Sequence, residues 1–312
     1  MTGPLRQLAV TATSHWPNYL PEYVAAEHGY FADEGLDFRR WAPEPWTVVL
    51  DDLDAGRAQI ALGGIWVPAM YHGRGREYRA FAALNARNPK AFVTREPVAD
   101  FGVADLAGKT VLAPGAGSAA YYIHTAGLVR RAGADPADVR FIRDLSGGTL
   151  TELFLGGLGD VLITDVVNAT VLQHAGHGHI ALRVDSLGLM PNSVYYTGPG
   201  HLDHEDRLPW AFSRALARAS QWLAANPARE LKALLRREWP GLDTGLLVDV
   251  VDDLRGTGLW ADIRIDRGSY DEWQDMLAEE HLIDAPVPFD VLVDPRPAEA
   301  AVAALAGSTT WS

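Results

Sequence analysis

The chain has 312 residues, of which 48% are hydrophobic and 21% are charged, and its formal net charge at pH 7 is −13. This length allows two lobes or one large domain with a substantial core, and the acidic charge argues against nucleic acid and anionic lipid as partners. No stretch approaches the roughly 20 apolar residues of a membrane-spanning helix, and the lack of cysteine excludes disulfides, thiolate nucleophiles and cysteine-bound metal sites.

Strand-like runs alternate with helical patterns from the start of the chain. Apolar residues recur at helical spacing between 21 and 35, and Gly35 is expected to end that helix. The other expected elements of this first set are strands at 7–12, 36–41, 58–64 and 78–84, a helical stretch within 46–56, and a short helix after Gly64. Such alternation is typical of a parallel α/β sheet.

A second α/β set follows an extended run at 91–96. Its expected strands are 109–114, 139–144, 160–165 and 179–184, and its expected helices are 118–132, 149–156 and 166–175. The segment NSVYYTG (192–198) reads as a strand that returns to the first set, and the chain is mostly helical from Pro209 onward. These patterns predict two lobes joined by two crossovers, with residues 1–90 and 193–312 in lobe 1 and residues 91–192 in lobe 2.

The stretch VLAPGAGSAAYYIH (111–124) allows more than one interpretation. A glycine-rich turn after a strand, with Asp144 ending the next strand, is one form of the dinucleotide-binding fingerprint. The same turn can place a helix N-terminus, with Ser118 as its cap, where it binds a carboxylate, sulfonate or phosphate. Ser118 can also be an ordinary cap without a ligand. The α/β set that precedes this turn favours anion binding over a nucleotide.

The chain resembles a known family in four segments taken in order: YLPEYVAAEHGYFADEGLDF, DAGRAQIALGG, DLAGKTVLAPGAGSAAYYI and GDVLITDVVNATVLQHAG. The family is that of the substrate-binding proteins of nitrate, sulfonate and taurine uptake and the related thiamine-pyrimidine synthases (NMT1/THI5-like). The resemblance covers about residues 7–294. It implies an α/β, two-lobed type II periplasmic-binding-protein fold with two crossover segments and a helical C-terminal part.

The resemblance also implies that loops at the strand C-termini hold a ligand in a cleft between the lobes. Carried onto this chain, those loops supply the expected ligand-binding residues: Ser14, Trp16, Tyr19, Trp41, Gly63, Gly64, Trp66, Asn85, Arg87, Gly117, Ser118, Ala119, Tyr121, Asp144, Thr164, Asp165 and Asn192. Trp16, Trp41 and Trp66 each follow a strand, so they are expected to face the ligand and to favour a flat or apolar body.

Among the titratable residues there is one candidate for ligand binding or acid–base catalysis. His15 stands beside Trp16 after the first strand, where it can hydrogen-bond a ligand or act as a general acid or base. The histidines of HAGHGH and HLDH have spacings that suit a metal, but they lie in connecting segments and are expected to be solvated, so no metal site is expected. Asp51, Asp52 and Asp54 are likewise expected on a solvated helix face.

Three functions follow. The first is a receptor for a small organic molecule that is anionic and partly aromatic. The second is an enzyme on the same fold, a lyase or decarboxylase with His15 as proton donor; without cysteine, and with only three lysines, the pyrimidine-synthase and desulfinase chemistries implied by the resemblance do not fit. The third is a sensor or carrier with a protein partner, which ranks last.

The N-terminus bears on where the protein works. It lacks the basic start, apolar segment and cleavage site of a secretory signal, so a cytoplasmic protein is expected. A periplasmic or extracellular location, with an ABC permease as partner, is expected only if a signal was removed. The expected partner is a small-molecule ligand, and no cofactor is expected.

Overall fold

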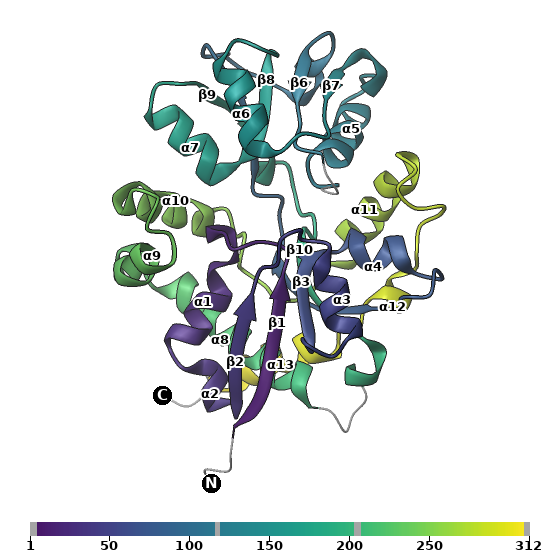
Figure 1. The fold of residues 1–312 in the computed structure, drawn as a ribbon, viewed down its shortest axis with the longest axis vertical. Coiled ribbons are helices and arrows are strands. Elements are labelled where there is room, and N and C mark those ends of the chain that lie inside the picture. The colour runs from purple at the N-terminus through teal and green to yellow at the C-terminus, as the bar shows by residue number, and fades with distance from the viewer. Residues whose placement is uncertain (1–4, 116–118, 203–206, 309–312) are drawn as a thin grey trace. The chain divides into compact units, whose positions relative to one another are not determined.

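The computed structural model describes residues 5–115, 119–202 and 207–308. Contacts divide the chain into two compact units, most of whose elements are labelled in Figure 1. Unit 1 comprises Met1–Ala86, Met190–Asp271 and Val287–Ser312, and unit 2 comprises Arg87–Leu189 and Glu272–Pro286. The sequence assigned 193–312 entirely to lobe 1, whereas here 272–286 pack with unit 2. Trp273, for example, lies edge-on to His124 with 5.4 Å between the ring centroids.

Unit 1 contains a five-stranded sheet with the order β2-β1-β3-β10-β4. Its strands are β1 (Arg6–Ala12), β2 (Leu36–Trp41), β3 (Ile60–Gly64), β4 (Arg79–Asn85) and β10 (Ser193–Thr197). The first four run parallel, and β10 runs antiparallel between β3 and β4. The prediction that 192–198 returns to the first set is therefore confirmed. Every residue of β10 is buried, as expected of a central strand.

Helices follow β1, β2, β3 and β10 of unit 1 and fill its C-terminal part. They are α1 (Leu20–Glu27), α2 (Tyr30–Asp33), α3 (Val48–Asp54), α4 (Trp66–Tyr71), α8 (Leu208–Ala225), α9 (Lys232–Glu238), α10 (Thr244–Gly256), α12 (Phe289–Leu292) and α13 (Arg296–Ser308), with 3₁₀ turns at Pro17–Tyr19, Pro199–Leu202 and Ala228–Leu231. The single helix expected over 21–35 is two helices, because Gly29 adopts a left-handed φ of 71° between them.

Aromatic side chains fix α8 against the sheet of unit 1. Phe212 of α8 packs on Phe31 and on Tyr195 of β10, with ring centroids 5.3 and 4.6 Å apart. All three are almost completely buried. Phe31 also stacks on Phe38 of β2 at 4.1 Å. Burial of each such side chain contributes about 2 kcal/mol, so this cluster holds α8 and α2 against β2 and β10.

Unit 2 repeats the arrangement, with the strand order β7-β6-β8-β5-β9. Its elements are β5 (Lys90–Thr94), β6 (Thr110–Leu112), β7 (Arg140–Ile142), β8 (Val161–Asp165), β9 (His179–Arg183), α5 (Tyr122–Arg131), α6 (Gly147–Leu155) and α7 (Val166–His174), with 3₁₀ turns at Val103–Leu106, Pro136–Asp138 and Val184–Ser186; α11 (Arg267–Glu279) starts in unit 1 and ends in unit 2. All four strands expected for this set are present. In the part of the chain that the structure describes, no helix has the length and apolarity to cross a membrane.

Candidate functional site

The carboxyl ends of three parallel strands of unit 1 meet at one edge of its sheet. Ser193, the first residue of β10, pairs with Gly64 of β3 and with Asn85 of β4. The Asn192 N–H donates to the Asn85 carbonyl at 3.1 Å, and the loop after β1 starts beside β3, where the Thr13 N–H donates to Leu62. The fold thus brings together expected site residues from four separate parts of the sequence, and Trp41 at the end of β2 is a fifth, paired with Thr11 of β1.

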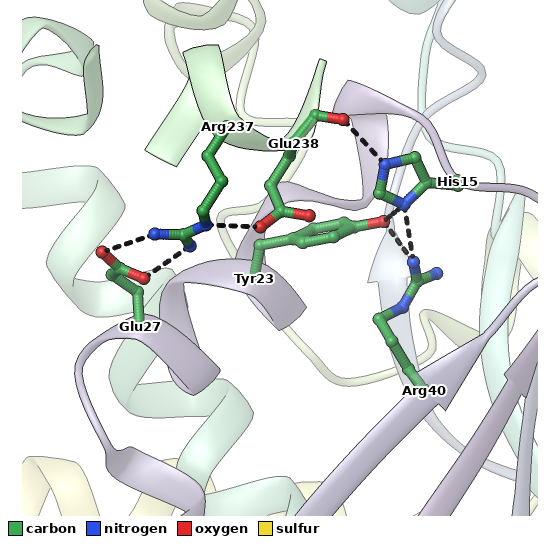
Figure 2. Close-up of polar contacts among 6 residues, drawn as sticks. All are labelled: His15, Tyr23, Glu27, Arg40, Arg237 and Glu238. Carbon is green, nitrogen blue, oxygen red and sulfur yellow. Dashed lines mark hydrogen bonds and ion pairs between the residues drawn. The ribbon is translucent and has the colours of Figure 1, made fainter. Parts of the chain in front are cut away.

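His15 in the first of these loops has both ring nitrogens in hydrogen bonds (Figure 2). Its Nε2 lies 2.9 Å from the carbonyl oxygen of Glu238, and its Nδ1 lies 2.6 Å from the hydroxyl of Tyr23 and 3.1 Å from Arg40. Because a carbonyl only accepts, Nε2 carries the proton and Nδ1 is the acceptor. Burial raises the pKa of Tyr23, so its hydroxyl stays protonated and donates to Nδ1. Both ring nitrogens are therefore occupied by hydrogen bonds within the protein.

Arg40 at the end of β2 is the charged centre of this network. Its guanidinium donates to the carboxylate of Glu22, which is completely buried, and to the hydroxyl of Tyr23. It also donates to the carbonyl of Ser14 at 3.1 Å. The second oxygen of Glu22 accepts from Tyr195 of β10 at 2.9 Å. The charge of Arg40 is therefore neutralised inside the unit, and its donors hold the loop after β1.

The C-terminal helices hold the same loop from another direction. The indole of Trp239 donates to the carbonyl of His15 at 3.4 Å, and that of Trp260 donates to Asn18 at 3.0 Å. Figure 2 also shows Arg237 of α9 joining Glu27 of α1, at 2.7 Å, to Glu238 at 3.0 Å. A ligand that meets residues 14–19 therefore meets a backbone whose conformation is set before it binds.

The aromatic residues expected at this edge have different surroundings. Trp66 is 7% exposed, and its indole covers Gly64, where an added Cβ would lie 2.2 Å from the ring. Trp41 is half-buried and donates from Nε1 to Asp52 at 2.8 Å, while Trp16 is partly exposed. Tyr19 is buried, with its hydroxyl 3.1 Å from that of Thr13.

The expectation that Asp52 is solvated is wrong. The residue is 4% exposed, and its carboxylate accepts from Thr11 at 2.8 Å and from Arg57 at 2.7 Å, as well as from Trp41. Burial alone would raise its pKa, but these three donors outweigh burial and hold the pKa below the usual range. Asp52 thereby orients the indole of Trp41.

Asn85 carries a buried side-chain amide at this edge. The residue is completely buried, and its Oδ1 accepts from Trp260 at 3.2 Å. Its Nδ2 is buried without a hydrogen-bond partner among the residues that the structure describes. An unpaired buried donor costs roughly 1–3 kcal/mol, so a group that accepts from it would be stabilised here.

Unit 2 has an edge of the same kind. Asp165 ends β8 and caps α7, accepting from the backbone and side chain of Asn168 at 3.1 and 2.6 Å, and Thr164 beside it is buried. Tyr121 lies under the ammonium of Lys90, which is 4.6 Å from the ring centroid. Arg87, expected to bind an anion, donates to the carbonyls of Asp185 and Gly188 at 2.9 and 3.3 Å.

His124 is buried next to this edge, and a hydrogen bond from Asn88 sets the tautomer of its ring. The Asn88 Nδ2 donates to Nδ1 of His124 at 2.9 Å and to the carbonyl of Ala120 at 2.8 Å. Burial lowers the pKa of His124 to about 3. The imidazole is therefore neutral and brings no positive charge to the edge.

The helix expected from residue 118 begins at Tyr122 instead. Asn88 takes the carbonyl of Ala120, and the N–H of His124 bonds to Ala119, so the regular ladder does not extend further toward the N-terminus. Ala119 is buried in the preceding turn. Gly117 and Ser118 lie outside the described residues. Asp144 is exposed with a left-handed φ of 71°, and a Cβ at Gly115 would lie 2.4 Å from its nitrogen.

An open hollow of about 430 Å³ lies at the opposite, amino-terminal edge of β6 and β8 in unit 2. Its polar groups form hydrogen bonds within unit 2. Arg95 donates to the carbonyls of Phe154 and Gly159, and Asp160 accepts from the Thr110 N–H. It contains none of the expected site residues. Among the described residues, no group of three or more histidines and carboxylates is placed to hold a metal ion.

Sequence reasoning missed Lys90, Arg40 and the buried Glu22. Two consecutive arginines at the end of a strand were a usable signal, because alternation must turn one of them inward. A glutamate in the first turn of an apolar helix is a natural partner for it. For Lys90, the signal was its position as the first residue of a central strand that is otherwise apolar.

Comparison with known proteins agrees with this architecture. The family described as NMT1/THI5 like matches residues 16–230. YtlA of Bacillus subtilis is 23% identical over 246 residues, which cover 78% of this chain and 74% of YtlA. The formylaminopyrimidine-binding protein of Halalkalibacterium halodurans is 28% identical over 228 residues, which cover 69% of this chain and 66% of the relative.

A solved structure supports the fold. The periplasmic aliphatic sulphonate-binding protein SsuA of Escherichia coli matches with a TM-score of 0.74 at 15% identity, over 93% of this chain and 92% of SsuA. That protein is periplasmic, so the comparison does not support the expectation of a cytoplasmic protein. The chain belongs to the NMT1/THI5-like family and has the type II periplasmic-binding-protein fold of ABC substrate-binding proteins.

Proposed function

We propose that this protein is a receptor that binds a small organic acid with a flat or apolar body, without changing it chemically. Two similar proteins are named for their ligands, one for formylaminopyrimidine and one for aliphatic sulphonates. The observation that carries the proposal is Asn85, whose buried Nδ2 awaits an acceptor at the edge where the loops of unit 1 meet. The aromatic residues Trp16, Tyr19 and Trp41 at that edge suit the body of such a ligand.

A binding panel tests the proposal. Calorimetry and thermal unfolding would be measured with pentanesulfonate, benzenesulfonate, benzoate and formylaminopyrimidine. A bound ligand raises the unfolding free energy by about 3 kcal/mol at 100 times its Kd, so the unfolding temperature should rise by several degrees. If none of the four compounds binds or shifts the transition, the proposed function is wrong.

Asn85→Leu locates the site. The substitution removes the unpaired donor at similar volume, and Trp260 keeps Asn18 as acceptor, so we expect binding to weaken about tenfold with little change in stability. The matched control is Gln274→Leu, which removes a buried amide from helix α11. Equal binding by the Asn85 variant and the unaltered protein would place the ligand elsewhere.

The enzyme alternative depends on His15. Since Nε2–H is bound to a carbonyl and Nδ1 accepts from Tyr23, exchange of a proton with a ligand through either nitrogen requires the hydrogen bond of that nitrogen to break. This favours a receptor. Product analysis after long incubation with each bound compound separates the two: unchanged compound supports the receptor, and turnover that His15→Ala abolishes would establish the enzyme.

An ABC permease is the partner that a receptor of this fold implies, provided that the protein is exported. Fractionation of the native host with an antibody to this chain tests that condition. Recovery only from the cytosol would exclude delivery to a permease and leave an intracellular carrier.

A further inference from the structure

We infer that the candidate site of unit 1 selects acids that carry one negative charge and rejects acids that carry two. The inference deepens the proposed function and rests on it. It concerns the carboxyl edge of the unit 1 sheet, where Ser193 of β10 pairs with Gly64 of β3 and with Asn85 of β4. Residues directly opposite each other in a sheet point to the same face, so Asn85 and Ser193 share one face at this edge.

The groups that form hydrogen bonds around Asn85 and Ser193 in the described part of the chain are uncharged. The Asn85 Oδ1 accepts from the indole of Trp260 at 3.2 Å, and its Nδ2 is buried without a partner among the described residues. The hydroxyl of Ser193 lies 3.5 Å from that of Tyr19, which lies 3.1 Å from that of Thr13. An acid group that meets Asn85 is therefore bound by amide and hydroxyl dipoles, which are weaker partners for a charge than a cation is.

A second buried group at this edge is uncharged as well. The hydroxyl of Tyr196 is buried without a partner among the described residues, and a Cβ on Gly63 would lie 3.2 Å from it. Burial raises the pKa of Tyr196, so this hydroxyl keeps its proton. Asn85 and Tyr196 thus both offer neutral donors.

Arg40 reaches one of the loops of this edge, but its charge is offset. Its guanidinium donates to the carbonyl of Ser14 at 3.1 Å and pairs with Glu22, and the side chains of the pair are 12% and 0% exposed. The second oxygen of Glu22 accepts from Tyr195, which lies two residues along β10 from Ser193 and therefore on the same face. The positive and the negative charge of the pair offset each other beside the edge.

The charge of the ligand decides how well neutral donors can replace water. The hydration free energy of an ion grows with the square of its charge, so a dianion loses about four times as much as a monoanion of the same size when it leaves water. Uncharged donors and a paired arginine bring no net positive charge to offset that difference. A sulfonate or a carboxylate therefore suits this edge, and the dianion of a phosphonate does not.

Benzenesulfonate and phenylphosphonate are matched probes, because they share the ring and a tetrahedral acid group. Benzenesulfonate is a monoanion throughout, whereas phenylphosphonate changes from mostly monoanion at about pH 5.5 to mostly dianion at about pH 8.5. Calorimetry on the full chain should show the Kd of phenylphosphonate rising about tenfold or more between these two pH values. The Kd of benzenesulfonate, which reports any effect of pH on the protein itself, should change by less than about threefold.

Two glutamate variants test whether charge at this edge sets the preference. Glu22→Gln leaves the charge of Arg40 unopposed, so at the higher pH it should lower the ratio of the phenylphosphonate Kd to the benzenesulfonate Kd by about fivefold or more. The matched control Glu34→Gln breaks the pair of Glu34 with Arg214, 2.6 Å apart, at the amino end of β2. It should leave the ratio unchanged. A variant that only destabilised the fold would weaken both compounds alike.

The outcomes separate this inference from the proposed function. If benzenesulfonate binds and phenylphosphonate binds equally well at both pH values, the inference is wrong and the proposed function stands. A ratio that a folded Glu22→Gln variant leaves unchanged would also overturn the inference. If that variant does not fold, the pH comparison on the unaltered protein decides alone. If no acid binds, the proposed function fails and takes this inference with it.

Discussion

At the scale of single residues, neighbouring carboxylates of one helix have opposite roles. Asp51 and Asp54 are exposed and accept from Arg76 and Tyr78, whereas Asp52 turns inward and accepts from Thr11 and Trp41. A buried carboxylate with three donors contributes to stability through hydrogen bonds that an exposed pair cannot match. The two environments allow a matched test within one turn of helix.

Asp52→Asn is expected to lower the free energy of unfolding by about 2 kcal/mol at neutral pH, and Asp51→Asn by less than about 1 kcal/mol. The folded pKa of Asp52 lies below the unfolded value of about 3.9, so its contribution is present above that pH and is lost as the pH falls through the folded pKa. Urea unfolding of both variants at pH 7 and at about pH 3 checks this. A gap between Asp52→Asn and the unaltered protein that does not narrow at the lower pH would contradict it.

His124 makes the folded protein sensitive to mild acid. Its pKa is about 3 when folded and about 6.5 when unfolded, so between these values only the unfolded chain takes up the proton. The free energy of unfolding then falls by up to about 1.4 kcal/mol for each pH unit below 6.5. His124→Gln, which keeps an acceptor for Asn88, should reduce the loss of thermal stability between pH 7 and about 5. His177→Gln, at an exposed histidine, should not.

At the scale of elements, two ion pairs tie helix α1 to its neighbours, and burial separates their effects. Glu22 and Arg40 join α1 to β2 with side chains 0% and 12% exposed, whereas Glu27 and Arg237 join α1 to α9 with side chains 37% and 55% exposed. Breaking a buried pair leaves a charge without a partner, while an exposed pair is screened by water.

Glu22→Gln should therefore lower the free energy of unfolding by about 3 kcal/mol, and Glu27→Gln by less than about 1 kcal/mol. Denaturant unfolding measures both. Adding Arg40→Met to Glu22→Leu should cost less than the sum of the single changes, because neither charge is then stranded. Strict additivity would show that the two side chains do not act as a pair.

At the scale of the whole molecule, the same strand order is built twice. In each sheet the strand that follows a crossover, β5 or β10, runs antiparallel among four parallel strands. Both strands are buried along nearly their whole length. Carboxyl ends of parallel strands, at which open α/β sheets bind ligands, are thus available in each unit.

The sequence by itself determined the class of fold, since hydrophobic periodicity marks most strands and helices from neighbouring residues alone. It also placed the loops of the candidate site, because these follow directly from the strand ends.

The tertiary structure decided which polar side chains turn inward. Asp52 meets Thr11 across 41 residues, and Glu22 meets Tyr195 across 173. The tertiary structure also decided where α5 begins, because the side chain of Asn88, 32 residues away in the sequence, donates to the carbonyl of Ala120. Contacts between distant parts of the chain leave no local pattern in the sequence. Only the folded chain therefore shows that Asp52 is buried, that both ring nitrogens of His15 form hydrogen bonds and that the Lys90 ammonium lies over the ring of Tyr121.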